Sequence, residues 1–141
     1  MKKSILILAV IAGIAMASCT KKASTTPVND PVDTAAVALY TGNFSDGPYG
    51  KTSGTATIYR SNSKWELRLE NFKVNNGPDL KVYLSKEQQP LNFIKLGDLK
   101  STTGNQTYPI NGMPDIMQYK YALIHCEQFN HLFGYTILVM P

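Results

Sequence analysis

The sequence predicts an all-β domain, an antiparallel β-sandwich or barrel-like fold of about eight short strands. Apolar and polar residues alternate with a period of two in several short segments, which are rich in β-branched and aromatic side chains. Clusters of glycine, proline, asparagine and serine separate these segments. No stretch of about twelve or more residues keeps a clean helical period, which argues against a helical domain.

The first four expected strands follow one another closely. Residues 38–44 open the domain, and the turn-forming sequence SDGPYG comes directly after them. Residues 52–60 alternate in polarity and are β-branched, and residues 65–72 place leucines on one face and charged side chains on the other. This pair is expected to form a hairpin with one solvated face. After the turn NNGP, residues 80–85 form the next strand, with leucine and valine on its inward face.

The remaining expected strands are shorter or less regular. A glycine interrupts one of them at position 97, and a proline interrupts another at position 109. Both interruptions favour a position at the edge of a sheet, because proline cannot donate a ladder hydrogen bond and glycine bends a strand. These strands are expected at residues 93–99, 107–110, 119–126 and 134–140.

The N-terminal residues have the pattern of a secretory signal. Lys2 and Lys3 precede an apolar run, residues 5–17, that is too short to cross a bilayer comfortably. The small residues directly before Cys19 resemble the lipobox of bacterial lipoproteins, whose cysteine is lipidated and becomes the first mature residue. We therefore predict a lipoprotein signal peptide over residues 1–18 and acyl chains such as palmitate on Cys19. An ordinary cleavable signal is the alternative.

Residues 19–35 are expected to be a lipidated, flexible tether. Residues 20–34 are small, polar and proline-bearing, a composition that buries too little apolar surface to fold alone. A coil of this length spans about 20 Å on average. The folded domain is expected at residues 36–141, held by its lipid anchor to a membrane of the bacterial cell envelope on the extracytoplasmic side.

Composition and charge restrict the function. The 141 residues are 43% hydrophobic and 17% charged, which fits one globular domain. Much of the net charge of +4 comes from the N-terminal region, and the remaining lysines form no basic cluster, so no nucleic-acid partner is expected. No carboxylate pairing, nucleophile elbow or phosphate-binding loop is recognisable. The protein is therefore not expected to be an enzyme, and is at most a redox module.

A series of short motifs runs through about residues 42–138: SGTA from Ser53, Asn71 with Phe72, GPDLKVYLS from Gly77, LGDL from Leu96, NQTY from Asn105, IHC from Ile124, Phe129, and Phe133 with Gly134. Together these motifs resemble the DM-thirteen domain family. That family is often associated with DOMON domains and is proposed to transfer electrons, with its cysteine acting as a bare thiol or a cofactor ligand. By this resemblance Cys126 is the family's cysteine, although His125 stands where tryptophan is common.

The candidate redox or cofactor-binding residues are Cys126 and His131. Lipidation of Cys19 would leave Cys126 without a disulfide partner in the chain. Cys126 shares a strand face with Ala122 and Ile124, so it is either a reactive thiol or a packed core residue. His125 is expected on the opposite face, whereas His131 lies beyond a turn and can fold back.

The cofactor and the metal stay open at this point. Haem bound through Cys126 with His131, Met113 or Met117 uses known types of axial ligand, and methionine with cysteine also suits copper. The absence of C-x-x-C-H excludes covalent haem attachment. Two functions therefore compete: an electron-transfer domain centred on Cys126 that meets a redox partner protein, and a noncatalytic surface-binding or structural β-sandwich whose cysteine is only packed.

Overall fold

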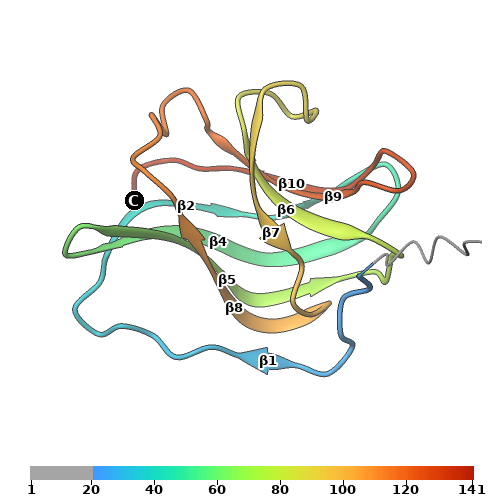
Figure 1. The fold of residues 1–141 in the computed structure, drawn as a ribbon, viewed down its shortest axis with the longest axis horizontal. Coiled ribbons are helices and arrows are strands. Elements are labelled where there is room, and N and C mark those ends of the chain that lie inside the picture. The colour runs from blue at the N-terminus through green and yellow to red at the C-terminus, as the bar shows by residue number, and fades with distance from the viewer. Residues whose placement is uncertain (1–20) are drawn as a thin grey trace, which may run out of the picture.

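The computed structural model describes residues 21–141, which form two β-sheets packed face to face (Figure 1). All neighbouring strands are antiparallel except β1 and β8, which are parallel. The fold is an all-β sandwich, as predicted. In spatial order the first sheet contains β1 (Val28–Asn29), β8 (Thr103–Ile110), β5 (Lys64–Val74), β4 (Thr52–Ser61) and β2 (Val37–Asn43). The second contains β3 (Ser45–Asp46), β10 (His131–Ile137), β9 (Tyr121–Cys126), β6 (Leu80–Ser85) and β7 (Phe93–Asp98).

The eight expected strands are present, and two further strands, β1 and β3, contain only two residues each. A segment of two residues has no period, so the alternation of polarity could not reveal them. The strand β7, which contains Gly97, lies at the edge of its sheet as expected. The strands β8 and β10 begin earlier than expected, at Thr103 and His131.

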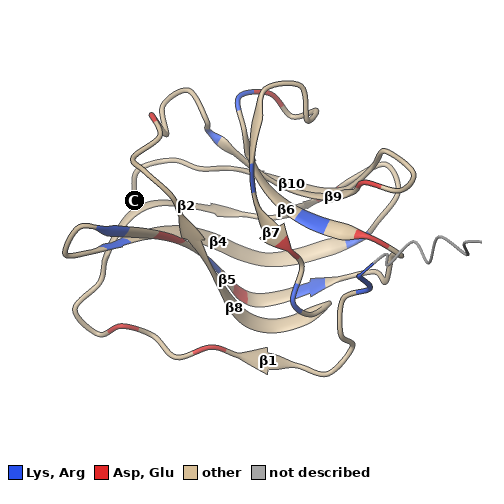
Figure 2. Cartoon of the chain, in the orientation of Figure 1, with Lys and Arg blue, Asp and Glu red and all other residues tan. Residues whose placement is uncertain are grey.

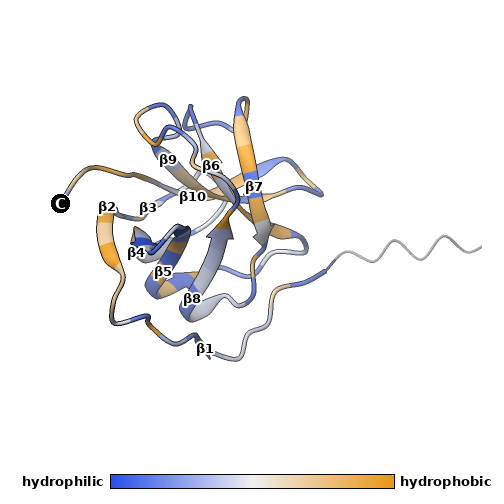
Figure 3. Ribbon diagram, turned by 60° about the vertical axis from the view of Figure 1, so that its left-hand side comes forward, coloured by the Kyte–Doolittle hydropathy of each residue, from blue (hydrophilic) through white to orange (hydrophobic). Residues whose placement is uncertain are grey.

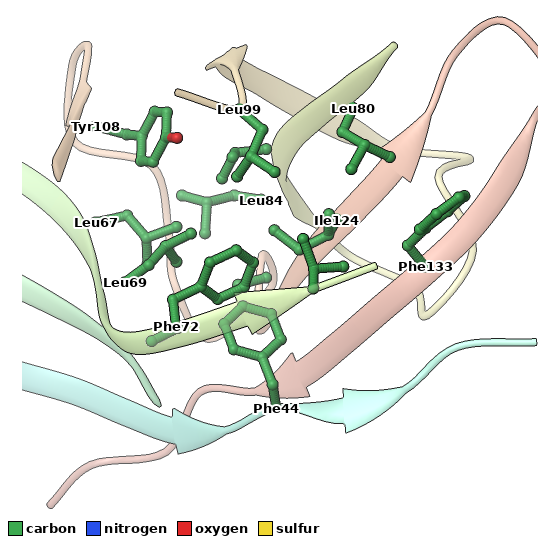
Figure 4. Packing of buried hydrophobic residues seen from close by; sticks show 14 of the residues in the cluster. Phe44, Leu67, Leu69, Phe72, Leu80, Leu84, Leu99, Tyr108, Ile124 and Phe133 are labelled. Carbon is green, nitrogen blue, oxygen red and sulfur yellow. The ribbon is translucent and has the colours of Figure 1, made fainter. Parts of the chain in front are cut away.

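The core lies between the two sheets, and the period of two in the sequence explains its composition. Leu67 and Leu69 of β5 are completely buried, and β6 contributes its alternating apolar residues from the other sheet (Figure 4). Alternation of hydrophobic and hydrophilic residues is visible along β5 in Figure 3. The rings of Phe44 and Phe72 meet edge to face, with centroids 5.4 Å apart. The inward side chains from β6 are Leu80, Val82 and Leu84.

The outer face of the hairpin β4–β5 is not fully solvated, in contrast to the expectation. The side chain of Arg68 is only 3% exposed, because the chain before β2 covers it. Its guanidinium donates hydrogen bonds to the carbonyl oxygens of Asp30, at 3.0 Å, and Pro31, at 3.1 Å. A tertiary contact with a segment more than thirty-five residues away therefore decides the environment of this face.

The segment before β2 lies along the first sheet, although the sequence predicts a flexible tether for residues 19–35. Ala23 is buried, Ser24 pairs with Ser101, and β1 pairs with β8. The Asp30 carboxylate accepts hydrogen bonds from the Thr107 amide, at 2.8 Å, and the Lys100 ammonium, at 2.6 Å. Part of the expected tether thus packs on the domain, because its backbone and polar side chains find partners there.

The predicted signal peptide, residues 1–18, and the predicted lipidation site Cys19 lie outside the described residues. Within residues 21–141, no helix is long and apolar enough to cross a membrane. Basic and acidic residues are interspersed along the described chain, on strands as well as in loops (Figure 2).

Candidate functional site

Cys126 is the last residue of β9, and its side chain is completely buried in the core between the sheets. Ile124 and Ala122, two and four residues before it, belong to the same buried cluster. The shared face predicted from the alternation is therefore confirmed. Leu80 of β6 is the cross-strand neighbour of Cys126 on one side. Cys126 is a free cysteine.

On its other side Cys126 pairs with His131, the first residue of β10. Phe133, two residues further along β10, is 93% buried and closes the core at this end of the sandwich. The connection between β5 and β6 also packs here, since a Cβ atom placed on Gly77 would meet the side chains of Leu80 and Phe133. The end of the core that contains the thiol is thus covered by Phe133 and this connection.

His131 belongs to an aromatic patch, which we define as Tyr49, Phe129 and His131. The imidazole stacks on the Tyr49 ring with centroids 3.6 Å apart and planes 3° apart. The Phe129 ring lies 5.9 Å away from the imidazole, inclined by 34°. Tyr49 is 57% exposed and Phe129 is 55% exposed. His131 therefore occupies the strand position opposite Cys126 and also stacks against a solvent-facing aromatic surface.

The residues around Cys126 do not fit a haem or copper bound through its sulfur in this conformation. The sulfur has no face open to a ligand, since the side chain is completely buried. Met113 and Met117 are exposed and precede β9, whereas Cys126 ends it, and this strand is about 17 Å long. Across residues 21–141, no three histidine, cysteine or acidic side chains group closely enough to hold a metal. We therefore assign no step to a bound cofactor.

His125 points to the opposite face of the sheet from Cys126, as alternation predicts, and lies among the side chains that cover this outer face. Its Nε2 is 3.0 Å from the Asn130 Oδ1, and its Nδ1 is buried without a hydrogen-bond partner among the described residues. Desolvation holds the pKa of His125 below its ordinary value despite the bond to Asn130. The imidazole is therefore neutral at pH 7.

Tyr83 of β6 lies beside His125 on this outer face and is only 1% exposed. Its hydroxyl donates a hydrogen bond of 2.5 Å to the Oε1 of Glu127. The ring of Phe93 covers Tyr83, with centroids 4.3 Å apart. Burial, and then the hydrogen bond and negative charge of Glu127, raise the pKa of Tyr83 far above its ordinary value. The phenol is thus protonated throughout the physiological range.

Glu127 is the residue after Cys126. Its carboxylate accepts the hydrogen bond from the buried Tyr83 phenol and is itself partly exposed to solvent. Its carboxylate also pairs with the ammonium of Lys95, at 2.9 Å. Burial of Glu127 opposes ionisation, but the hydrogen bonds from Tyr83 and Lys95 outweigh it and lower the pKa of the carboxyl. Glu127 is therefore an ionised acceptor at pH 7.

A second charged group lies on the same face of β6. The Lys81 ammonium contacts the carboxylates of Asp79, at 2.6 Å, and Asp98, at 2.5 Å. The sequence showed no pairing for Asp79, Asp98 or Glu127. Asp98 meets Lys81 through strand register, whereas Asp79 lies only two residues before Lys81 along the chain. One signal for Tyr83 was present: alternation in residues 80–85 places it opposite the core-facing leucines.

A comparison with known families finds one match. The family described as Electron transfer DM13 matches residues 43–138, a range that contains Cys126, His131, Tyr83 and Glu127. No curated protein and no solved structure matches the chain significantly.

Proposed function

The chain belongs to the Electron transfer DM13 family, and from this premise we propose that it is a lipid-anchored electron-transfer protein of the bacterial envelope whose redox centre is Cys126. It takes part in electron transfer with a redox partner protein and does not transform a substrate. The observation that carries the proposal is the position of Cys126, at the end of β9 and opposite His131 of the aromatic patch.

This position gives a buried sulfur a short path to the surface. Directly paired residues of antiparallel strands have Cα atoms about 4.5–5.5 Å apart, and the His131 ring is stacked on exposed Tyr49. Electrons cross short distances through packed side chains without contact between solvent and the redox atom. A partner that docks on the aromatic patch would therefore lie close to Cys126 while the thiol stays buried.

The anchoring part of the proposal rests on the N-terminal sequence. A basic start, a short apolar run and small residues before Cys19 form the pattern of a lipoprotein leader. Acyl chains on Cys19 would attach the domain to the membrane, since each buried CH₂ group contributes about 0.8 kcal/mol to binding. The domain would then meet its partner on the extracytoplasmic side.

The second candidate function is a noncatalytic surface-binding or structural module. The observation in its favour is the complete burial of Cys126 among apolar side chains. A small hydrophobic thiol is a common core residue and needs no chemical role. The two functions predict different results when the sulfur of Cys126 alone is replaced: the first predicts loss of the redox response, and the second predicts no such loss.

The test compares Cys126→Ser with Ala122→Ser, which introduces the same hydroxyl on the same buried face of β9. Full-length lipoprotein, purified in detergent, is immobilised on an electrode and examined by film voltammetry. We expect the wild type and Ala122→Ser to show a redox response that Cys126→Ser lacks. An equal response from both variants, or none from the wild type, would remove Cys126 as the centre and favour the packed module.

A further inference from the structure

Three tyrosine hydroxyls in the described part of the chain bond to carboxylate or amide side chains, and they differ in depth and partner. Tyr83 donates to the Glu127 carboxylate over 2.5 Å and is 1% exposed. Tyr59 donates to the Glu70 carboxylate over 3.3 Å and is only partly buried. Tyr108 is 3% exposed, but its partner is the amide oxygen of Gln106. Tyr83 alone among these three combines deep burial with a short bond to an anionic acceptor.

We propose that Tyr83 is a redox-active tyrosine and that Glu127 accepts its phenolic proton during oxidation. In the forward step the phenol loses one electron to a one-electron oxidant, and its proton moves along the existing hydrogen bond to Glu127. The products are a neutral tyrosyl radical and a protonated carboxyl group. In the return step a one-electron donor reduces the radical, and Glu127 gives the proton back. The inference rests on the proposed electron-transfer function, to which it adds a second redox group.

The hydrogen bond makes this oxidation feasible in a buried site. A phenol that has lost an electron is a strong acid, and a buried cation without compensation is costly. Transfer of the proton over 2.5 Å avoids this cation, because the ring becomes a neutral radical. The Lys95 ammonium keeps Glu127 ionised and positioned before the step. Tyr108 has no such acceptor, since an amide oxygen binds a proton only weakly.

The surroundings of Tyr83 also supply a path for the electron. Phe93 stacks on the buried ring and is itself 42% exposed, on the edge strand β7. A redox partner at this edge contacts Phe93, which is in contact with Tyr83. On the other side Glu127 directly follows Cys126 in the chain, so the phenol is linked through one hydrogen bond to the end of β9. Tyr83 therefore lies between the end of β9, which contains Cys126, and the exposed ring of Phe93.

The experiment oxidises the full-length lipoprotein in detergent with photogenerated ruthenium(III) tris(bipyridine), a one-electron oxidant, and follows tyrosyl radicals by electron paramagnetic resonance. We expect Tyr83→Phe to remove at least half of the long-lived radical signal, since the exposed tyrosines give short-lived radicals. Tyr108→Phe and Tyr59→Phe, which remove the hydroxyls of the comparison pairs, are expected to keep that signal. Thermal unfolding checks that each variant is folded.

Glu127→Gln tests the proton acceptor while Tyr83 itself is unchanged. Glutamine keeps an oxygen that can accept the hydrogen bond, but it cannot take the proton. We expect radical formation to slow at least tenfold, whereas Glu70→Gln beside Tyr59 leaves the rate unchanged. Since Glu127 lies in a turn and is partly exposed, this variant gives a result even where Tyr83→Phe disturbs the packing.

The outcomes separate this inference from the proposed centre at Cys126. A long-lived signal that survives in Tyr83→Phe, or an unchanged rate in Glu127→Gln, would overturn the redox role of Tyr83, whatever the voltammetry of Cys126→Ser shows. Loss of the radical in Tyr83→Phe together with a full redox response in Cys126→Ser would support Tyr83 and reject Cys126.

Discussion

At the scale of single residues, the outer face of β6 shows how a buried charge is accommodated. Burial of Lys81 would by itself lower the pKa of its ammonium, but the hydrogen bonds and charges of Asp79 and Asp98 raise it above the ordinary value. The bond from Lys81 in turn lowers the pKa of the Asp98 carboxyl. The ammonium is thus compensated by one carboxylate before β6 and another at the end of β7.

The lowered pKa of Asp98 predicts a loss of stability in acid. Its folded-state pKa lies below the unfolded value of about 3.9, so its contribution is fully present above that pH and is lost as the pH falls through the folded pKa. We expect Asp98→Asn to lower the free energy of unfolding by about 1 kcal/mol at pH 7, because the carboxylate is one-third exposed.

Urea unfolding of the wild type and Asp98→Asn, measured from pH 7 down to pH 2, checks this prediction. The difference between the two proteins should shrink as the pH approaches 2. Glu66→Gln, on β5 of the other sheet, serves as the control for loss of a carboxylate. A difference that stays constant across the whole range would show that the Lys81 pair does not contribute through ionisation.

At the scale of elements, local sequence predicted strands well where a turn signal and an alternating run coincide. The bounds of β6 agree with the expectation, because a GP turn precedes six alternating residues that contribute leucine and valine to the core. The strands β1 and β3 escaped prediction because two-residue strands exist only through their partners β8 and β10. For the same reason nothing local indicated that Arg68 would be covered.

The packing of β1 on β8 depends on Gly104. This residue has a φ of +108°, and a Cβ atom there would overlap the backbone of Val28. We expect Gly104→Ala to cost about 1–3 kcal/mol of stability and to loosen the segment from Ser24 to Asp30. Hydrogen exchange should show faster exchange of the Ser24 and Asp30 amides, which bond to Lys100 and Asn105.

Gly112→Ala is the matched control, because Gly112 also has a positive φ, of 76°, but a Cβ atom there meets no neighbour within 4 Å. It should impose a similar backbone strain without moving β1. Equal protection of the Ser24 and Asp30 amides in both variants would mean that the segment does not depend on close approach at Gly104.

At the scale of the whole molecule, the candidate site was predicted in part. The face of Cys126, and the opposite direction of His125, follow from the alternation along β9. The stack of His131 on Tyr49 could not be foreseen, since the two residues are more than eighty positions apart and meet only after β3 pairs with β10. Tyr83 and Glu127 likewise meet across strands. Sequence therefore identified Cys126 and His131 as candidates, but not the stack of His131 on Tyr49 or the contact between Tyr83 and Glu127.

The proposed anchor makes a prediction for the whole protein. Cys19→Ala, expressed with its own leader, should move from the membrane fraction to the soluble extracytoplasmic fraction, because it lacks the acylated side chain. Cys126→Ser should stay in the membrane fraction and serves as the control for loss of a thiol. Fractionation with detergent-free washes and immunoblotting measures both. Retention of Cys19→Ala in the washed membranes would rule out Cys19 as the anchor.

The position of Lys22 near the connection between β5 and β6 bears on how a partner reaches the protein. Lys22 shares a hollow with Asn76, Gly77 and Pro78. The connection between β5 and β6, which contains the last three, lies at the same end of the sandwich as the turn from β9 to β10 (Figure 1). Only four residue steps separate Cys19 from buried Ala23, a reach of at most about 14 Å. With its lipid on Cys19, the protein would hold the Cys126 end close to the bilayer. A redox partner would then meet the protein close to the membrane surface.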